Sequence, residues 1–301
     1  MLQHYNWLID GPIPTHPVPL PAEAAFIKHL ETVELLTTSK EKNNLCQTMG
    51  FNYRQVVGEL LWPCVIKLSQ YLDNPAKPHY LAASEVTNYL AATITKGIYY
   101  WCETTLDSLP DCPLQTLHSN NYVLQKTASN TADLTGMVDS DWAADSVKRK
   151  SILGIIIMLA GGYIAYKSKY QDVIALSTTE AEFVAACNAG KLILFFRLLL
   201  KDLVMPQDKA TILYEDNHGA LMMANAQQPT RQMHHIDLKH FSILDWVERD
   251  LLLLEEISTH DNAADAMTKC LPKILFYRHL DTYMGRRKPD YVQIKNSAMT
   301  A

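Results

Sequence analysis

The stretch that most constrains the fold lies between residues 134 and 169, where apolar runs flank a pair of glycines. The segments "LTGMVD" (134–139) and "SILGIIIMLAGGYIAYKSK" (151–169) are rich in Ile and Met, and Gly161-Gly162 interrupts the second one. β-Branched and other apolar residues on either side of a turn dipeptide are typical of strands. The sequence therefore predicts three consecutive strands in this stretch.

Helices and strands alternate in the residues that follow. We expect a long helix from about Thr178 to Leu203, and then a strand, two helices, a strand and a final helix, at "ATILYED" (210–216), "HGALMMANA" (218–226), "HIDLKHFSILDWVERD" (235–250), "LLLLEEIS" (251–258) and "NAADAMTK" (262–269). Three strands followed by alternating helices and strands indicate an α/β fold, with a mixed sheet covered by helices on both faces.

The residues before this region have a different pattern. The chain starts with a proline-rich stretch over residues 1 to about 22, and its pattern is helical and aromatic from Tyr53 to Trp101. Residues 103 to 130 resemble a loop, with Pro110, Pro113 and the polar "HSNNY". A chain of 301 residues is long enough for roughly two domains. We therefore expect a domain boundary between residues 103 and 130.

Charge and cysteine usage exclude several classes of protein. The net charge of -5 gives no overall attraction to phosphate backbones, so a nucleic-acid partner must be held by local basic residues or by metal ions. The six cysteines are scattered without a CxxC pair, which favours free thiols in a reducing compartment. No signal peptide is apparent, and the apolar "LILFFRLLL" is interrupted by Arg197 and too short for a bilayer. We expect an intracellular protein, cytoplasmic or nuclear, that is not secreted and has no membrane partner.

Four acidic residues fall at the ends of predicted elements. Asp139 and Asp216 each end a strand, Glu180 opens the long helix, and Asp265 lies in the last helix. If these carboxylates converge, they repel one another unless cations lie between them. Such a cluster can hold two Mg²⁺ ions, which activate a water and stabilise the leaving oxygen in phosphodiester cleavage. The alternative is that these residues are solvated surface groups.

The long helix begins with two glutamates, and only one of them can point into such a cluster. Ser177-x-x-Glu180 and Thr179-x-x-Glu182 both match the capping box, in which a hydroxyl and a carboxylate satisfy free amides of the first turn. Two residues along a helix correspond to a rotation of about 200°. Apolar residues follow both glutamates, so periodicity does not decide between them.

Six segments follow one another along the chain: "GMVDSDWAAD", "KSILGIIIMLAGGYIAYKSKYQ", "ALSTTEAEF", "YEDNHGAL", "HHIDLKHF" and "NAADAMTKCLP". In this order they resemble the ribonuclease H domain of copia-type retrotransposon polyproteins. The earlier segments "YRQVVGELLW", "KLSQYLDNPAKPHYLAASEVTNYL" and "GIYYW" resemble the thumb and connection of the same reverse transcriptases. The resemblance covers about residues 52 to 285.

The resemblance implies a ribonuclease H that cuts the RNA strand of RNA–DNA hybrids with two Mg²⁺ ions, for which Mn²⁺ can substitute. Its catalytic and metal-binding carboxylates match Asp139, Glu180, Asp216 and Asp265. On this basis Glu180 is the expected metal ligand and Glu182 the capping residue. Weaker candidates for substrate contacts are Asn217, His218, Lys167, Lys169, His235 and Lys239, for which helix capping by Asn217 and a solvated basic face are the alternatives.

The chain also departs from the family. It has no Tyr-x-Asp-Asp motif, so no polymerase activity is expected, and Glu215 stands where the family often has Cys. The resulting prediction is a Pro-rich leader and short helix (1–50), a thumb/connection-like helical remnant (51–128), an RNase H-like domain with a mixed five-stranded sheet (129–290) and a tail (291–301). An alternative function is a catalytically silent remnant that binds nucleic acid or other retroelement proteins.

Overall fold

The computed structural model describes most of the regions in which elements were predicted. The described residues are 29–36, 38–59, 68–93, 97–100, 133–145, 149–225 and 237–285, and the side chains of 58, 59, 225 and 237–241 are not among them. The proline-rich leader, the expected boundary at 103–130, the tail and His235 lie outside this part of the chain. The division into domains therefore stays a prediction.

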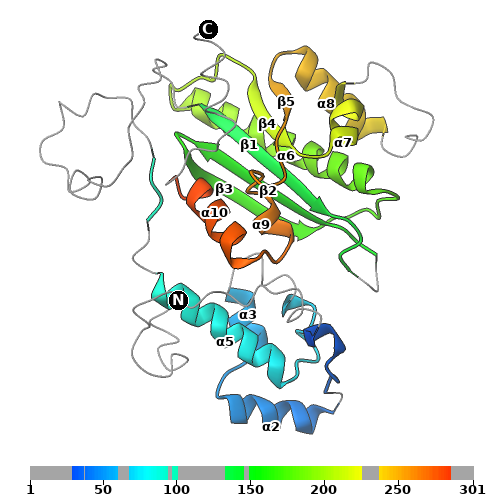
Figure 1. Ribbon diagram of the computed structural model, residues 1–301, viewed down its shortest axis with the longest axis vertical. Helices are drawn as coiled ribbons and strands as arrows, with labels where there is room; N and C mark the ends of the chain where they lie inside the picture. The colour runs from blue at the N-terminus through cyan, green and yellow to red at the C-terminus, as the bar shows by residue number, and fades with distance from the viewer. Residues whose placement is uncertain are drawn as a thin grey trace, which may run out of the picture.

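A mixed five-stranded sheet forms the centre of the described C-terminal part (Figure 1), as the sequence predicted. Its strand order is β3-β2-β1-β4-β5, and the strands are β1 (Leu134–Asp141), β2 (Ile152–Leu159), β3 (Gly162–Tyr170), β4 (Thr211–Glu215) and β5 (Leu252–Glu256). The first three strands pair antiparallel, whereas β4 lies parallel to β1 and β5 lies parallel to β4. The carboxyl ends of β1, β4 and β5 therefore lie at the same end of the sheet.

The turn between β2 and β3 explains Gly161, the first glycine of the pair, whereas Gly162 is already the first residue of β3. Ala160 and Gly161 both have positive φ, at 50° and 79°. A two-residue hairpin turn with positive φ at both positions matches the twist of the flanking strands, and Gly adopts this conformation without a steric penalty.

Helices cover both faces of the sheet, and each face has its own core. On one face lie α6 (Thr178–Asp202), α7 (His218–Asn225) and α8 (Asp237–Glu248); on the other lie α9 (Asp265–Thr268) and α10 (Lys273–Tyr283). Side chains alternate along β1, so that Val138 belongs to the core under α6 while Met137 belongs to the core under α9 and α10. Asp139 shares the side of Met137.

Helix α6 is long and apolar enough to cross a membrane, judged by its length and composition alone. About half of its most apolar window is buried inside the protein, where Phe183, Ala186 and Ile193 pack in the core beneath the sheet. A core helix of a globular protein meets the same criteria. Burial accounts for the apolar residues of its first half, whereas Phe195 and Leu198 further along the helix are 57% and 64% exposed.

The described N-terminal part contains the helices α2 (Ser39–Met49), α3 (Tyr53–Glu59) and α5 (Lys77–Ala92). Thr38 and Glu41 form a capping box at the start of α2, and Gly50 ends it with a φ of 77°. The apolar residues of these helices belong to the same core as α9 and α10. Tyr89 and Phe276, for example, meet edge to face with ring centroids 6.0 Å apart.

Candidate metal centre

Asp139 lies at the middle of the site, near the carboxyl end of the central strand β1. Its side chain is only 1% exposed. The residue opposite it on β2 is Gly154, and a Cβ atom there would come within 2.8 Å of the carbonyl oxygen of Ala264 and the side chain of Met267. The glycine therefore lets the segment around α9 approach the sheet beside Asp139.

The structure exchanges the expected places of the two glutamates on α6. Glu182, not Glu180, lies with the aspartates at the end of the sheet. The helix starts after Ser177, whose Oγ accepts a hydrogen bond from the amide of Glu180, and the Glu180 carboxylate in turn accepts one from the amide of Leu176 at 2.8 Å. Glu180 is thus the capping residue, and Glu182, about 200° further around the helix, faces the cluster.

Only the location of the helix start distinguishes the two glutamates. Because Ser177 is the N-cap, the residue three positions later, whose amide donates to its Oγ, is Glu180. Both hydroxyl–glutamate pairs fit the motif in sequence. The helix was predicted correctly, but Glu182 lies beside the aspartates where Glu180 was expected.

Asp216 follows the end of β4 and faces Asp139 from the neighbouring strand. The hydroxyl of Thr259 donates a hydrogen bond to its carboxylate. The preceding residue, Glu215, is fully buried, and its Oε1 accepts a hydrogen bond from the amide of Asn217 at 3.0 Å. Glu215 therefore adds another buried carboxyl group next to the cluster.

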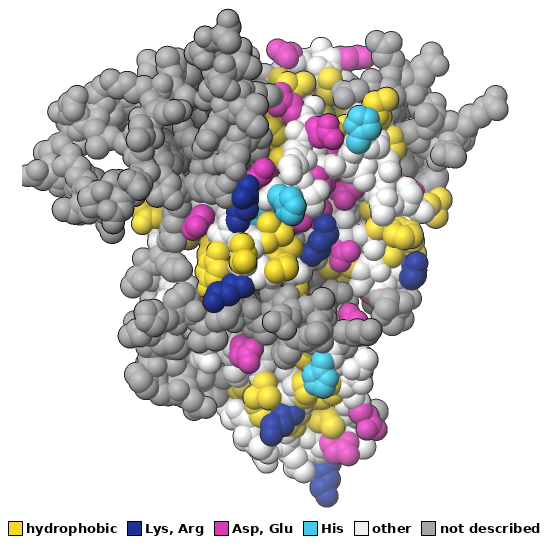
Figure 2. Space-filling view, viewed as in Figure 1, with side chains coloured by type: hydrophobic (Ala, Val, Ile, Leu, Met, Phe, Trp, Pro, Cys, Tyr) yellow, Lys and Arg dark blue, Asp and Glu magenta, His cyan; other side chains and the backbone are white. Residues whose placement is uncertain are grey.

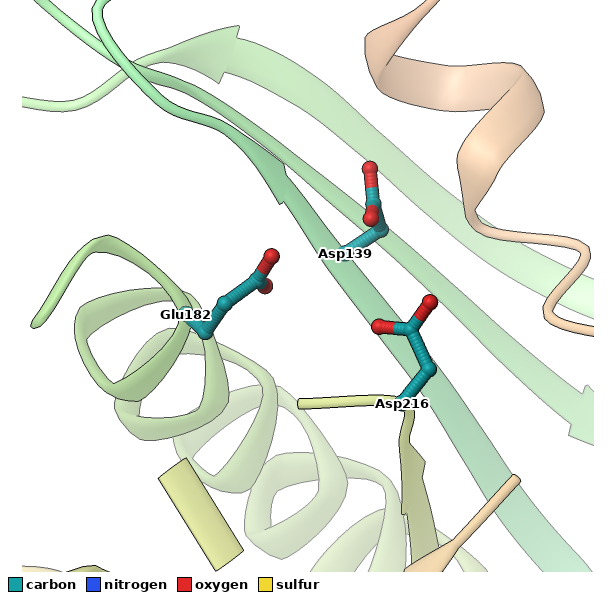
Figure 3. Close-up of side chains that lie close together, drawn as sticks. All are labelled: Asp139, Glu182 and Asp216. Carbon is teal, nitrogen blue, oxygen red and sulfur yellow. The ribbon is translucent and has the colours of Figure 1, made fainter. Parts of the chain in front are cut away.

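Asp139, Glu182 and Asp216 converge from a strand, a helix and a strand end (Figure 3). One carboxylate oxygen of each lies within 4.8 Å of the others. Glu182 is 6% exposed, and its Oε2 has no hydrogen-bond partner within the described part of the chain. A buried oxygen without a partner is costly unless it is protonated or a cation binds it. This donor set consists of carboxylate oxygens, which suits hard cations such as Mg²⁺ and Mn²⁺.

Crowding changes the acidity of these groups. Burial, followed by repulsion from Glu215 and Asp139, raises the pKa of Glu182 far above its ordinary value. Burial and the charge of Asp139 also raise the pKa of Asp216. Without a metal the cluster therefore retains protons near neutral pH, and a bound cation would favour the ionised form.

Asp265 meets Asp139 on the opposite side of the cluster. Lys269 lies between the two aspartates, with its Nζ 3.2 Å from Oδ1 of each. Thr268 donates a hydrogen bond to the other oxygen of Asp139. Burial and the charge of Asp139 raise the pKa of Asp265 to about 8, although Lys269 opposes this shift.

Three residues that the sequence interpretation missed hold these elements in place. Asn262 is fully buried, and its side-chain amide donates a 2.8 Å hydrogen bond to the carbonyl of Val138, next to Asp139. Gln171 similarly joins the end of β3 to α6 through the carbonyl of Ala181 at 2.8 Å. The third is Lys269, whose i+4 spacing from Asp265 is the one sequence signal that could have identified it.

The structure describes the side chains of four of the six weaker candidates for substrate contacts, which stay predictions in that role. Asn217 caps α7, because its Oδ1 accepts the amide of Ala220 at 3.0 Å, which is the alternative left open by the sequence. His218 and Lys167 are exposed, and Lys169 pairs with Asp172. Lys239 lies on α8, but its side chain is not described. On the face in Figure 2, basic side chains form separate spots among acidic and apolar ones.

The fold and the site together define an α/β protein with a buried carboxylate cluster suited to divalent cations. No family model matches the chain. The chain is 28% identical over 268 residues to the retrovirus-related Pol polyprotein from transposon TNT 1-94 of Nicotiana tabacum, and 30% identical over 233 residues to that from transposon RE2 of Arabidopsis thaliana. These matches cover 85% and 74% of the chain.

Its homologues are copia-type retrotransposon Pol polyproteins, which confirms the predicted resemblance. The chain spans only 18% of the length of the first relative and 14% of the second. Among solved structures, LC11-RNase H1 from compost is similar with a TM-score of 0.36 and 17% identity, over 46% of this chain and 94% of that one. A foamy viral protease-reverse transcriptase in complex with dsDNA is similar with a TM-score of 0.29 and 14% identity, over 79% and 42%. Likenesses this distant say nothing by themselves about activity.

Proposed function

We propose that this chain is a ribonuclease H that uses divalent metal ions to hydrolyse the RNA strand of RNA–DNA hybrids. The observation that carries the proposal is the convergence of Asp139, Glu182 and Asp216 from separate elements, with a buried Glu182 oxygen that lacks a partner in the described residues. The homology to retrotransposon Pol polyproteins supports nucleic acid as the substrate class.

Four carboxylates would hold the ions. Asp139, Glu182 and Asp216 form one group of ligands. Asp139 also belongs to a second group, together with Asp265 on its other side. Two Mg²⁺ ions there would supply an activated water and neutralise charge on the departing oxygen of the phosphodiester. In this proposal Glu182 replaces Glu180 among the expected ligands.

The surrounding residues of the chain orient these ligands. Thr268 holds one oxygen of Asp139 and Thr259 holds the carboxylate of Asp216, so both side chains are fixed before substrate binds. Asn262 ties the segment before Asp265 to β1. Fixed ligands of this kind reduce the reorganisation needed to reach the reactive arrangement. RNA would be distinguished from DNA by its 2′-hydroxyl groups in the minor groove of the hybrid.

The test is incubation of the protein with a labelled RNA–DNA hybrid in Mg²⁺ or in EDTA. We expect loss of the RNA strand only with metal. Asp139→Asn and Glu182→Gln should each lower the cleavage rate by about 100-fold or more. Loss of a residue that only hydrogen-bonds to a metal ligand costs about 10- to 100-fold, and these two substitutions alter a ligand itself.

Glu180→Gln is the matched control for Glu182→Gln. It alters the cap of the same helix, so it should reduce stability by about 1 kcal/mol and leave cleavage in place. Cleavage that survives Glu182→Gln but is lost in Glu180→Gln would reverse the roles that we propose. A hybrid that stays intact with and without Mg²⁺ would instead favour the catalytically silent remnant.

A further inference from the structure

Lys269 brings a positive charge into the carboxylate cluster from the surface. Its side chain is 38% exposed, whereas Asp139 and Asp265, which it contacts, have side chains that are 1% and 4% exposed. The backbone amide of Lys269 is fixed by a 3.0 Å hydrogen bond to the carbonyl of Asp265 at the end of α9. The backbone is therefore anchored, while the flexible four-carbon side chain can swing between the cluster and solvent.

The two sides of Asp139 differ in whether a positive charge already lies beside the carboxylate oxygens. Toward Glu182 and Asp216, the buried Glu182 Oε2 has no hydrogen-bond partner within the described residues. Toward Asp265, the oxygens already share the ammonium group of Lys269 at 3.2 Å. An ammonium ion and a divalent cation compete for the same oxygens here, since Mg²⁺ needs them at about 2.0–2.1 Å and the two positive charges repel.

We propose that Lys269 is an internal competitor for the second divalent cation. In the metal-free protein it occupies the position between Asp139 and Asp265 and compensates their charge. The first ion binds at Asp139, Glu182 and Asp216 with the lysine in place, and a second ion binds only after the ammonium group moves outward. This inference rests on the proposed function, because it assumes that the cluster binds metal. Lys269 acts in this scheme by occupying the place of the second ion, and it does not itself hold either ion.

The first test is calorimetric titration of Mn²⁺ into the full chain without metal. The parent protein should bind one ion more strongly and a second more weakly. In Lys269→Met the second site should strengthen by about tenfold or more while the first changes little, because a nearby positive charge has been removed. Lys269→Gln gives a second, polar version of the same change if the methionine variant does not fold.

Two further variants separate charge from packing. Lys269→Arg keeps the positive charge and should leave the second site as weak as in the parent. Lys273→Met removes an exposed lysine four residues away and should change neither site. Thermal melting provides a second measurement: without metal Lys269→Met should melt at a lower temperature than the parent, since Asp139 and Asp265 lose their counter-ion, and Mn²⁺ should raise its melting temperature by more.

The outcomes distinguish this inference from the function on which it rests. If neither the parent nor any variant binds Mn²⁺, the proposed metal site itself is wrong. If the parent and both neutral variants bind two ions with the same affinities, the metal site stands and Lys269 is not a competitor. A second site that weakens when Lys269 is neutralised would also overturn the inference.

Discussion

The two faces of the sheet are built differently. The core under α6, α7 and α8 is made only of residues between 134 and 254. The core on the face of α9 and α10 also takes residues from the N-terminal helices, from Leu30 to Tyr89. The buried apolar side chains of those helices, apart from Ala91, belong to this shared cluster, and the described residues contain no second cluster made of the helices alone. The face of α6, α7 and α8 has a core of its own, whereas the N-terminal helices share the core on the face of α9 and α10.

Separating the N-terminal helices from the part of the chain that contains the sheet should have the largest effect. A fragment of residues 133–285 should remain folded, because it keeps the complete core around Phe183 and Ile193. A fragment of residues 1–100 should not fold alone, because short helices without a sufficient apolar core are marginal in water. Circular dichroism during thermal melting measures both. A cooperative transition in the N-terminal fragment by itself would show that the helical region is an independent domain.

A point substitution at the shared core should have a smaller but still large effect. Tyr89 is 2% exposed and contacts Phe276 of α10, so Tyr89→Ala should lower the free energy of unfolding of the whole chain by about 3 kcal/mol. Leu81→Ala is the control on the same helix, because Leu81 is 47% exposed and should change stability by about 0.5 kcal/mol or less. Chemical denaturation measures both values. Two separate transitions, of which only the earlier moves in Tyr89→Ala, would contradict a shared core.

The smallest effect concerns the place where the two faces meet, at the carboxylate cluster. Burial raises the pKa of Glu182 and that of Asp265, the latter to about 8. The folded state therefore binds protons more tightly than the unfolded state, so stability is highest in acid and falls as pH rises through about 8. Between pH 7 and 8 the metal-free protein should lose about 1.4 kcal/mol or less for each such proton, and the part due to Asp265 should level off above pH 8.

Mg²⁺ and one substitution serve as controls for this pH dependence. Bound Mg²⁺ favours the ionised carboxylates, so it should flatten the profile, and Glu182→Gln should remove part of it. Thermal melting at several pH values provides the measurement. If the metal-free protein became more stable over the same range, these carboxyl groups would not be protonated as their burial indicates.

Much of the architecture could be predicted from the sequence, because it depends on local patterns. The strands around Gly161, the long helix from Thr178, and the aspartates at the ends of β1 and β4 follow from apolar periodicity and turn residues. The order of motifs also indicated the relatives that the comparisons confirm. The strands, the helix and the positions of the aspartates need only neighbouring residues to specify them.

Only the tertiary structure decided which charges meet. Both Glu180 and Glu182 fit a capping motif, and the choice depended on where the helix starts and on which of its sides faces Asp139. The position of Lys269 between Asp139 and Asp265 depends on the close approach of α9 to β2 at Gly154, which no local pattern contains. Sequence determines the elements through short-range preferences, whereas contacts between residues more than a hundred positions apart arise only when the elements pack.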